Sequence, residues 1–152
     1  MIVVIQRVLN SKCIINEKLF SEIDKGIVAF IAIEKDDKEE DYDYCIKKIL
    51  NLRIFENEEN KFDKSIIDIN GEIMVISQFT LAGTIHKGNR PSFDNAMEPS
   101  KANIEFEKFL NKLKEKYNKI KVGIFGEFML IDLKNIGPVT FIIDSKKRLW
   151  FL

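Results

Sequence analysis

The sequence predicts a mixed α/β protein in which two helices pack against a largely antiparallel sheet. Three observations lead to this fold class: β-branched runs fill both ends of the chain, two segments have the apolar spacing of amphipathic helices, and no linker-like stretch divides the 152 residues. We therefore expect one domain that spans residues 1–152, with strands, a helix, a strand, a second helix and further strands in that order.

The first part of the chain is predicted to form successive strands. Residues 2–8 are rich in β-branched side chains, the Asn-Ser pair at 10–11 has turn propensity, and residues 12–16 are expected to return as a second strand. A further turn at 24–26 precedes the apolar run 27–33, whose composition is typical of a buried strand.

Two segments have helical periodicity. One covers residues 38–52, with acidic side chains in its first turns, where the helix dipole favours negative charge. The other begins at Pro99 or is capped by Ser100, and its apolar stripe extends from Ala102 to Tyr117. Elsewhere we expect a solvated loop at 56–65, and strands at 71–77, 119–124, 128–133 and 139–143 with a break at 135–138.

Bulk composition narrows the function classes. Lys and Arg number 24, as do Asp and Glu, so the net charge of zero predicts neither nucleic-acid nor membrane binding. Cys13 and Cys45 lie in apolar patterns typical of core packing, which suits a reducing compartment. No apolar run approaches the roughly 20 residues of a membrane span, and the N-terminus enters a strand pattern at once, without a signal peptide. We expect a soluble, cytoplasmic protein.

Side chains for familiar kinds of catalysis are scarce. The chain has one histidine, His86, so neither a Ser-His-Asp triad nor a two-histidine metal site fits in one chain. The chain has no phosphate-binding glycine loop, and Asp68 and Asp132 have no evident partner. We expect His86 to be solvated, and we predict no metal or cofactor.

Two polar or constrained stretches interrupt the strands. Residues 77–81 place Ser, Gln and Thr where a buried strand ends, and residues 135–140 place a Gly-Pro pair between two strands. Each has an ordinary interpretation: hydroxyls that bond local backbone in the first stretch, and a simple turn in the second. The other interpretation is that each stretch delivers groups to a site.

Four motifs together resemble the D-aminoacyl-tRNA deacylases. They are MIVVIQRV at the start, SQFTL at 77–81, KGNRPSF at 87–93 and NIGPVTF at 135–141, and their order and spacing match that family over the whole chain. The resemblance implies a barrel-like sheet and a homodimer that hydrolyses the ester between a D-amino acid and the terminal adenosine of tRNA. It also implies action on glycyl-tRNA, a role in chiral proofreading during translation, and no metal or dissociable cofactor.

The resemblance also implies roles for individual residues. One subunit supplies the catalytic residues and the pocket lining, which are Ser77, Gln78, Phe79 and Thr80, with Leu81, Phe125 and Met129. The partner subunit inserts a Gly-cisPro pair, which maps to Gly137 and Pro138, and Arg7 braces that pair.

Elementary chemistry is compatible with such a site. An aminoacyl ester is activated, so it needs a well-placed water and a stabilised oxyanion more than a strong nucleophile. Backbone N–H groups near Phe79 and Thr80 are candidates for the second task. Thr80 is either a positioning residue or a covalent nucleophile, and the resemblance favours the first, with the ribose 2′-hydroxyl assisting. A rigid backbone at Gly137 and Pro138 would exclude L-substrates by filling the space of their side chains.

Lys87 and Arg90 lie beside the expected site and are candidate contacts for tRNA phosphates.

Two further functions stay open beside the deacylase. Basic side chains such as these also allow a nucleic-acid-binding module of this fold that acts on DNA with little catalysis. The third possibility is a dimeric scaffold in which both stretches are only turns. Turnover of D-tyrosyl-tRNA would indicate the deacylase, and salt-sensitive binding to duplex DNA without turnover would indicate the binding module. The absence of both would indicate the scaffold.

Overall fold

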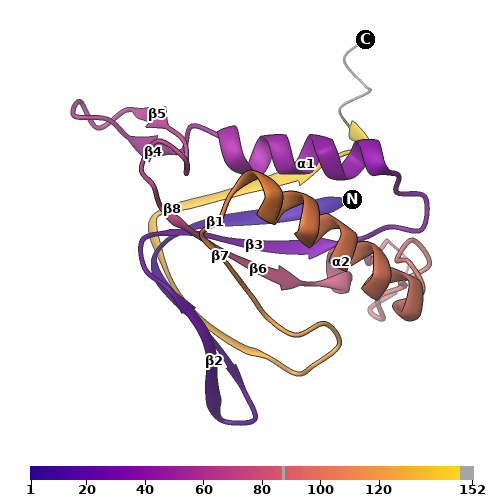
Figure 1. Cartoon of the computed structure of the whole chain (residues 1–152). Coiled ribbons are helices and arrows are strands. Elements are labelled where there is room, and N and C mark those ends of the chain that lie inside the picture. The colour runs from indigo at the N-terminus through magenta and orange to yellow at the C-terminus, as the bar shows by residue number, and fades with distance from the viewer. Residues whose placement is uncertain (87, 148–152) are drawn as a thin grey trace.

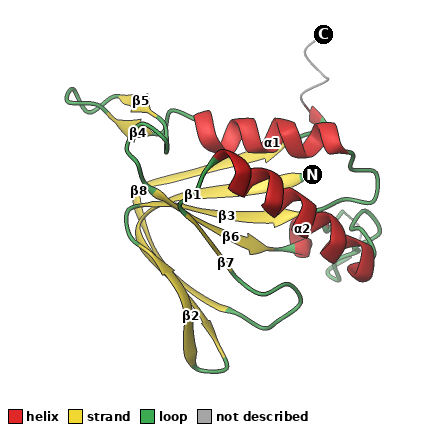
Figure 2. Ribbon diagram, viewed as in Figure 1, coloured by secondary structure: helices red, strands yellow, loops and turns green. Residues whose placement is uncertain are grey.

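The computed structural model describes residues 1–86 and 88–147, which form a mixed sheet with both helices on one face (Figure 1, Figure 2). The elements in chain order are β1 (Ile2–Ile15), β2 (Lys18–Ile23), β3 (Gly26–Ala32), α1 (Glu39–Asn51), β4 (Phe55–Glu56), β5 (Phe62–Lys64), β6 (Glu72–Ser77), the short 3₁₀ helix η1 (Phe79–Ala82), α2 (Pro99–Lys116), β7 (Ile120–Val122) and β8 (Leu130–Asp144).

Strand β1 is the centre of the sheet. It pairs antiparallel with β2, β3 and β8, whereas β3 with β6 and β6 with β7 are parallel pairs. A parallel pair requires a crossover connection, and α1 and α2 supply the two crossovers. The two crossovers have the same hand and step across the sheet in the same direction, from β3 to β6 and from β6 to β7. Their helices therefore lie on the same face of the sheet (Figure 2). The predicted mixed, largely antiparallel sheet with two helices is confirmed.

The main core lies between the sheet and the two helices. Val3 and Ile5 of β1 meet Ile46 of α1 and Phe109 of α2 there, all with no exposed surface. A smaller apolar cluster, which includes Met74, lies on the opposite face. Successive residues of a strand point to opposite faces, so the apolar strands serve both clusters.

The helices begin with polar caps. The N–H of Lys38 donates to Asp41 Oδ2 at 2.9 Å at the start of α1. In α2, Pro99 occupies the start of the helix, and the carboxylate of Glu98 accepts from the N–H of Ser100 at 3.1 Å. Both helices match the expected ranges closely. Within the described part of the chain, neither has the length and apolar character that a bilayer crossing needs.

The predicted turn at 10–11 is wrong. Strand β1 continues through it, and the chain reverses instead at Asn16 and Glu17, which have φ angles of 50° and 61°. Ser11 is fully buried, and its hydroxyl donates to the carbonyl oxygen of Asp132 in β8 at 2.9 Å. The turn signal failed because this serine bonds across the sheet rather than to its own neighbours.

Two further boundaries differ from the expectation. Residues 56–65 are not simply a loop, because they contain most of the hairpin β4–β5, in which the buried Phe55 pairs with Lys64. The expected break at 135–138 lies inside β8, which is one long strand whose register to β1 is irregular there. The Gly-Pro pair therefore belongs to a bulge rather than to a turn.

A charged cluster, buried except for Lys146, joins the start of β1 to the end of β8 and to α1. The ammonium group of Met1 donates to Ser145 Oγ at 2.9 Å, and Lys146 Nζ lies 2.9 Å from Asp41 Oδ2. Burial raises the pKa of the Asp41 carboxyl, but hydrogen bonds from Lys146 and from the Lys38 backbone outweigh burial and lower that pKa to about 2.

Candidate active site

Strand β6 ends at the edge of its parallel ladder, and a polar segment follows it. The N–H of Gln78 donates to the carbonyl oxygen of Ile31 in β3 at 2.7 Å, and the chain then enters η1. The first N–H groups of any helix lack a partner within that helix. In η1, the N–H of Leu81 is the first to be used, with the carbonyl oxygen of Gln78 at 3.3 Å.

Two backbone donors are therefore left at this strand end. They belong to Phe79 and Thr80, and within the described residues no acceptor takes either N–H. An unpaired backbone N–H is a strong donor that water or a ligand must satisfy. The hydroxyl of Thr80 donates to Gln78 Oε1 at 2.8 Å, which leaves the hydroxyl oxygen free to accept a hydrogen bond.

A cavity of about 550 Å³ lies beside this segment. Its walls come from β3, β6 and η1, from the start of α2 and from residues 125–131. Five aromatic side chains contribute to them: Phe30, Phe79, Phe93, Phe125 and Phe128. The rings of Phe79 and Phe93 pack edge to face with their centroids 5.0 Å apart. An apolar cavity with a few polar groups at its rim has the composition of a small-ligand site.

The structure brings most of the expected pocket residues together. The residues that line the cavity include Ser77, Gln78, Phe79, Phe125 and Met129. Thr80 and Leu81 follow in η1, where Thr80 is exposed and Leu81 is half-buried. Sequence reasoning missed Phe30 and Phe128, because a phenylalanine within or before a strand carries no signal that separates a pocket wall from ordinary core.

The second irregular stretch is a braced bulge. The pairing between β1 and β8 leaves residues 136–139 opposite Arg7 alone. Asn135 closes the base of the bulge, because its Oδ1 accepts from the N–H of Val139 at 2.8 Å and its Nδ2 donates to Thr140 Oγ1 at 3.1 Å. One amide side chain thus ties both ends of the bulge together.

Arg7 holds the bulge from beneath. Its residue surface is only 4% exposed. Its Nε donates to the carbonyl oxygen of Ile136 at 3.1 Å, and its Nη1 donates to the carbonyl oxygen of Ile54 at 2.8 Å. Its Nη2 lies 3.1 Å from Glu56 Oε1. A buried charge with all these partners is held in one orientation.

Gly137 and Pro138 form the exposed tip of the bulge. The peptide bond between them is cis, and Gly137 has a φ of +125°. A Cβ atom at position 137 would lie 2.8 Å from Arg7 Nη2 and 2.8 Å from Val139 Cγ2. Only glycine fits this conformation and this space.

The tip and the cavity are distant within one chain. Arg7 is paired with Ile27 of β3, whereas Ser77 is paired with Ile31, four residues or about 13 Å further along that strand. The strands β1 and β3 also separate β8 from β6, which adds about 14 Å across the sheet. Among the described residues, none from 135–140 lines the cavity. The two stretches therefore do not meet within one chain.

The remaining expected residues lie in the loop between η1 and α2. Arg90 and His86 are both exposed, as expected for a solvated histidine, and Lys87 lies outside the described residues. Contact with tRNA phosphates stays a prediction for both basic residues. In the part of the chain that the structure describes, no three His, Cys, Asp or Glu side chains gather in a way that could hold a metal ion.

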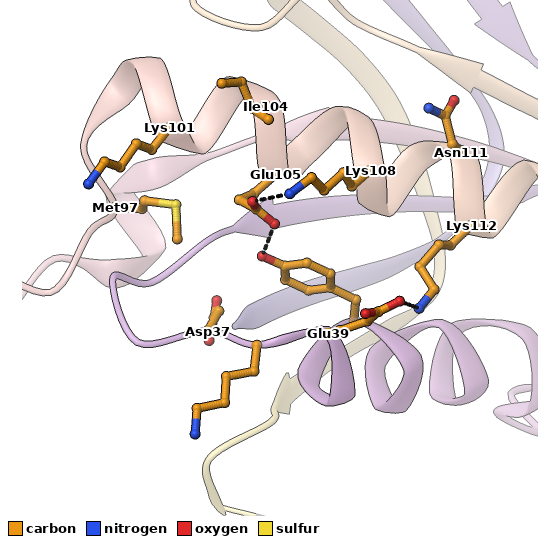
Figure 3. A pocket seen from close by; sticks show the side chains of 11 residues that line it. Asp37, Glu39, Met97, Lys101, Ile104, Glu105, Lys108, Asn111 and Lys112 are labelled. Atoms are coloured by element: carbon orange, nitrogen blue, oxygen red, sulfur yellow. Dashed lines mark hydrogen bonds and ion pairs between the residues drawn. The ribbon is translucent and has the colours of Figure 1, made fainter.

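A second cavity, of about 670 Å³, lies between α1 and α2 (Figure 3). Glu105 accepts from the hydroxyl of Tyr42 at 2.9 Å and pairs with Lys108 at 2.6 Å, while Lys112 pairs with Glu39 at 2.6 Å. Burial and the Glu105 carboxylate raise the pKa of Tyr42. The polar groups named here already bond to one another, so they give no indication of a bound ligand.

Comparison with known proteins shows the family of the chain. A family model described as D-Tyr-tRNA(Tyr) deacylase matches residues 4–144. The chain is 52% identical over 146 residues to a D-aminoacyl-tRNA deacylase of Persephonella marina, across 96% of this chain and 99% of the relative. It is 49% identical over 144 residues to a D-aminoacyl-tRNA deacylase of Aquifex aeolicus, across 95% and 97% of the two chains.

Two solved structures have the same fold. The c-Myc DNA Unwinding Element Binding Protein superposes with a TM-score of 0.91 at 37% identity, over 95% of this chain and 98% of that one. A probable eukaryotic D-amino acid tRNA deacylase superposes with a TM-score of 0.81 at 17% identity, over 93% and 97%, and shows the fold alone. The resemblance that the four motifs indicated is confirmed: the chain belongs to the D-Tyr-tRNA(Tyr) deacylase family, whose members are hydrolases that act on an ester bond.

Proposed function

We propose that this enzyme releases D-amino acids from tRNA in the cytoplasm by hydrolysing their ester to the terminal ribose, with the cavity at the end of β6 as its active site. Family membership supports the substrate class. One observation supports the location of the chemistry, namely the two unpaired N–H groups of Phe79 and Thr80 beside an aromatic cavity. Donors that are already in place where negative charge develops stabilise an oxyanion without reorganisation.

The proposed reaction needs no enzyme nucleophile. Water attacks the ester carbonyl, the N–H groups of Phe79 and Thr80 donate to the oxyanion, the bond to the ribose oxygen breaks, and that oxygen takes a proton. The hydroxyl of Thr80 donates to the neutral amide of Gln78, which is not a base, so Thr80 acts as a positioning residue. The ribose 2′-hydroxyl next to the ester assists the proton transfer.

The aromatic walls suit the terminal adenosine of tRNA. A nucleobase stacks on aromatic side chains with about 1–3 kcal/mol per base. Phe79 and Phe93 present such rings next to the catalytic segment, and the volume of about 550 Å³ lies in the usual range for small-ligand sites. Seating the base there would bring the ester to the N–H groups of η1.

Chiral selection is assigned to a second copy of the chain. The tip at Gly137 and Pro138 cannot reach the cavity of its own chain, because about 20 Å of sheet lies between them. We place the tip of the partner subunit in the cavity, where its stiff backbone occupies the space of an L side chain. D side chains then point outward, and glycine, which has no side chain, is accepted, so glycyl-tRNA is a second substrate.

Exposed apolar side chains support the homodimer. Around the tip, Ile136 is 39% exposed, Phe141 37% and Ile142 72%. Large apolar side chains that are exposed together mark surfaces for association. Because Phe141 and Ile142 are successive residues of β8 and point to opposite faces of the sheet, a second copy placed along β8 would cover part of this apolar surface and carry each tip toward the other subunit.

The test compares three substrates with the purified protein. D-tyrosyl-tRNA and glycyl-tRNA should be deacylated and L-tyrosyl-tRNA spared, while sedimentation reports a dimer. Equal rates for D- and L-tyrosyl-tRNA would contradict the proposal, as would full activity in a monomer.

A second candidate function follows from the name of one similar structure, which describes a DNA-binding protein. A binding module of this fold predicts salt-sensitive affinity for duplex DNA and no turnover of D-tyrosyl-tRNA. The net charge of zero gives no general attraction to phosphate, so the deacylase is favoured. Measuring both activities in one preparation distinguishes them.

A further inference from the structure

The β4–β5 hairpin holds the guanidinium group of Arg7 from two sides. Glu56 Oε1 lies 3.1 Å from Arg7 Nη2, and the centroid of the Phe62 ring lies 5.5 Å from the guanidinium carbon. The side chain of Arg7 is 5% exposed and that of Glu56 is 46% exposed, so the ion pair lies at the edge of a buried guanidinium group. The hairpin thus contacts the same arginine that bonds the carbonyl oxygen of Ile136.

These contacts fix the plane of the guanidinium group. Its donors lie in one rigid plane, so a bond at one edge sets the direction of the others. Glu56 engages Nη2, and the carbonyl oxygen of Ile54 engages Nη1 at 2.8 Å, which leaves Nε aimed at Ile136 at 3.1 Å. A Cβ atom at Gly137 would lie only 2.8 Å from Nη2, so this end of the guanidinium group lies close to the tip.

Phe62 links the hairpin to β8 directly as well. Its ring packs edge to face against Phe141, with centroids 6.5 Å apart, three residues after Pro138. One aromatic side chain therefore packs over the arginine and against the strand that leaves the tip.

We infer that Glu56 and Phe62 are positioning residues for chiral selection, which act through Arg7 on the Gly137–Pro138 tip. This inference rests on the proposed function of the tip. The residues that determine specificity would then include two from a hairpin that contributes no residue to the described lining of the cavity.

The test uses Glu56→Gln and Phe62→Leu, with Glu59→Gln as the matched control. Glu59 belongs to the same hairpin turn, but its side chain is 70% exposed and pairs with Lys61 at 2.7 Å. For the first two variants, we expect the ratio of kcat/KM for D- over L-tyrosyl-tRNA to fall roughly tenfold, mainly through faster L hydrolysis, because a charge-assisted or cation–π contact is lost. Glu59→Gln should keep the wild-type ratio, and Phe62→Tyr, which retains the ring, should restore it.

A second measurement does not depend on activity. Solvent exchange of the Arg7 Nε–H, followed by NMR, should be slow in the wild type and in Glu59→Gln and faster in Glu56→Gln and Phe62→Leu. A wild type that discriminates between D and L, with an unchanged ratio and unchanged exchange in both variants, overturns this inference alone. A wild type that hydrolyses both substrates equally overturns the proposed function, and this inference with it.

Discussion

The two irregular stretches of the chain, 77–81 and 135–140, are held in opposite ways. The first leaves the sheet with two N–H groups unused and a hydroxyl that bonds only a neighbouring amide. The second has a buried arginine beneath it, an asparagine that ties its two ends, and a glycine whose position has no room for a Cβ atom.

This difference teaches what each stretch can do. A group that must bond a transition state has to stay unpaired in the free protein, although each unmet backbone bond costs about 1–3 kcal/mol when it is buried. A backbone that must exclude a side chain by shape has to resist displacement, which requires several fixed contacts. Substitutions at the tip should therefore change the free energy of unfolding, and substitutions in the 77–81 stretch should change turnover.

Arg7→Met should have the largest effect on the free energy of unfolding. The change leaves the carbonyl oxygens of Ile54 and Ile136 without their donor and Glu56 without its partner, so we expect a loss of about 3–5 kcal/mol in urea denaturation. Arg53→Met is the control, because Arg53 is 65% exposed and its ion pair with Asp63 lies in solvent. Removing such a surface ion pair should lower the free energy of unfolding by less than about 1 kcal/mol. Equal losses in both variants would show that the tip is not braced.

Gly137→Ala should come second. The φ of +125° and the two contacts at 2.8 Å predict a loss of about 2–3 kcal/mol, read from the denaturation midpoint. Gly126→Ala separates conformation from crowding, since Gly126 also has a positive φ, +80°, but has no atom within 4 Å of an added Cβ. That control should lose only about 1 kcal/mol. A loss at 137 no greater than at 126 would contradict the close fit against Arg7.

The sequence singled out both stretches, but it did not predict the contacts that brace one of them and leave two N–H groups of the other unpaired. The helical stripes and β-branched runs predicted both helices and most strands, because burial of one face dictates their spacing. SQFTL and NIGPVTF singled out the two stretches by resemblance, and their roles stay predictions. That Gly137 belongs to a bulge depends on how the flanking residues of β8 pair with β1, and Glu56 and Phe62 contact Arg7 from 49 and 55 residues away. Local pattern carries no information about contacts of that range.

Acid should also affect a third region, the cluster around Asp41, whereas neither stretch itself contains an ionisable side chain. The Asp41 carboxyl has a pKa lowered to about 2, so its ionised form stabilises the fold at pH values above about 4, its unfolded value. This contribution, about 2 kcal/mol, should be lost as pH falls from about 4 through 2. Asp41→Asn should flatten that part of the stability–pH curve. If the difference in the free energy of unfolding between the wild type and Asp41→Asn stays constant from pH 6 to 2, the acid sensitivity arises from groups other than Asp41.

Thr80→Val should have the smallest effect on the free energy of unfolding and a large effect on turnover. Valine keeps the shape of threonine, and the lost hydroxyl bond to Gln78 is exposed, so stability should change by less than about 0.5 kcal/mol. Without an oriented hydroxyl, kcat for D-tyrosyl-tRNA should fall by up to roughly a hundredfold, since a misplacement of about 1 Å at the reacting centre can cost that much. Complete loss of turnover with intact substrate binding would instead identify Thr80 as the nucleophile. A loss of stability as large as that of Gly137→Ala would remove the contrast between the stretches, because the strand end would then be braced as firmly as the tip.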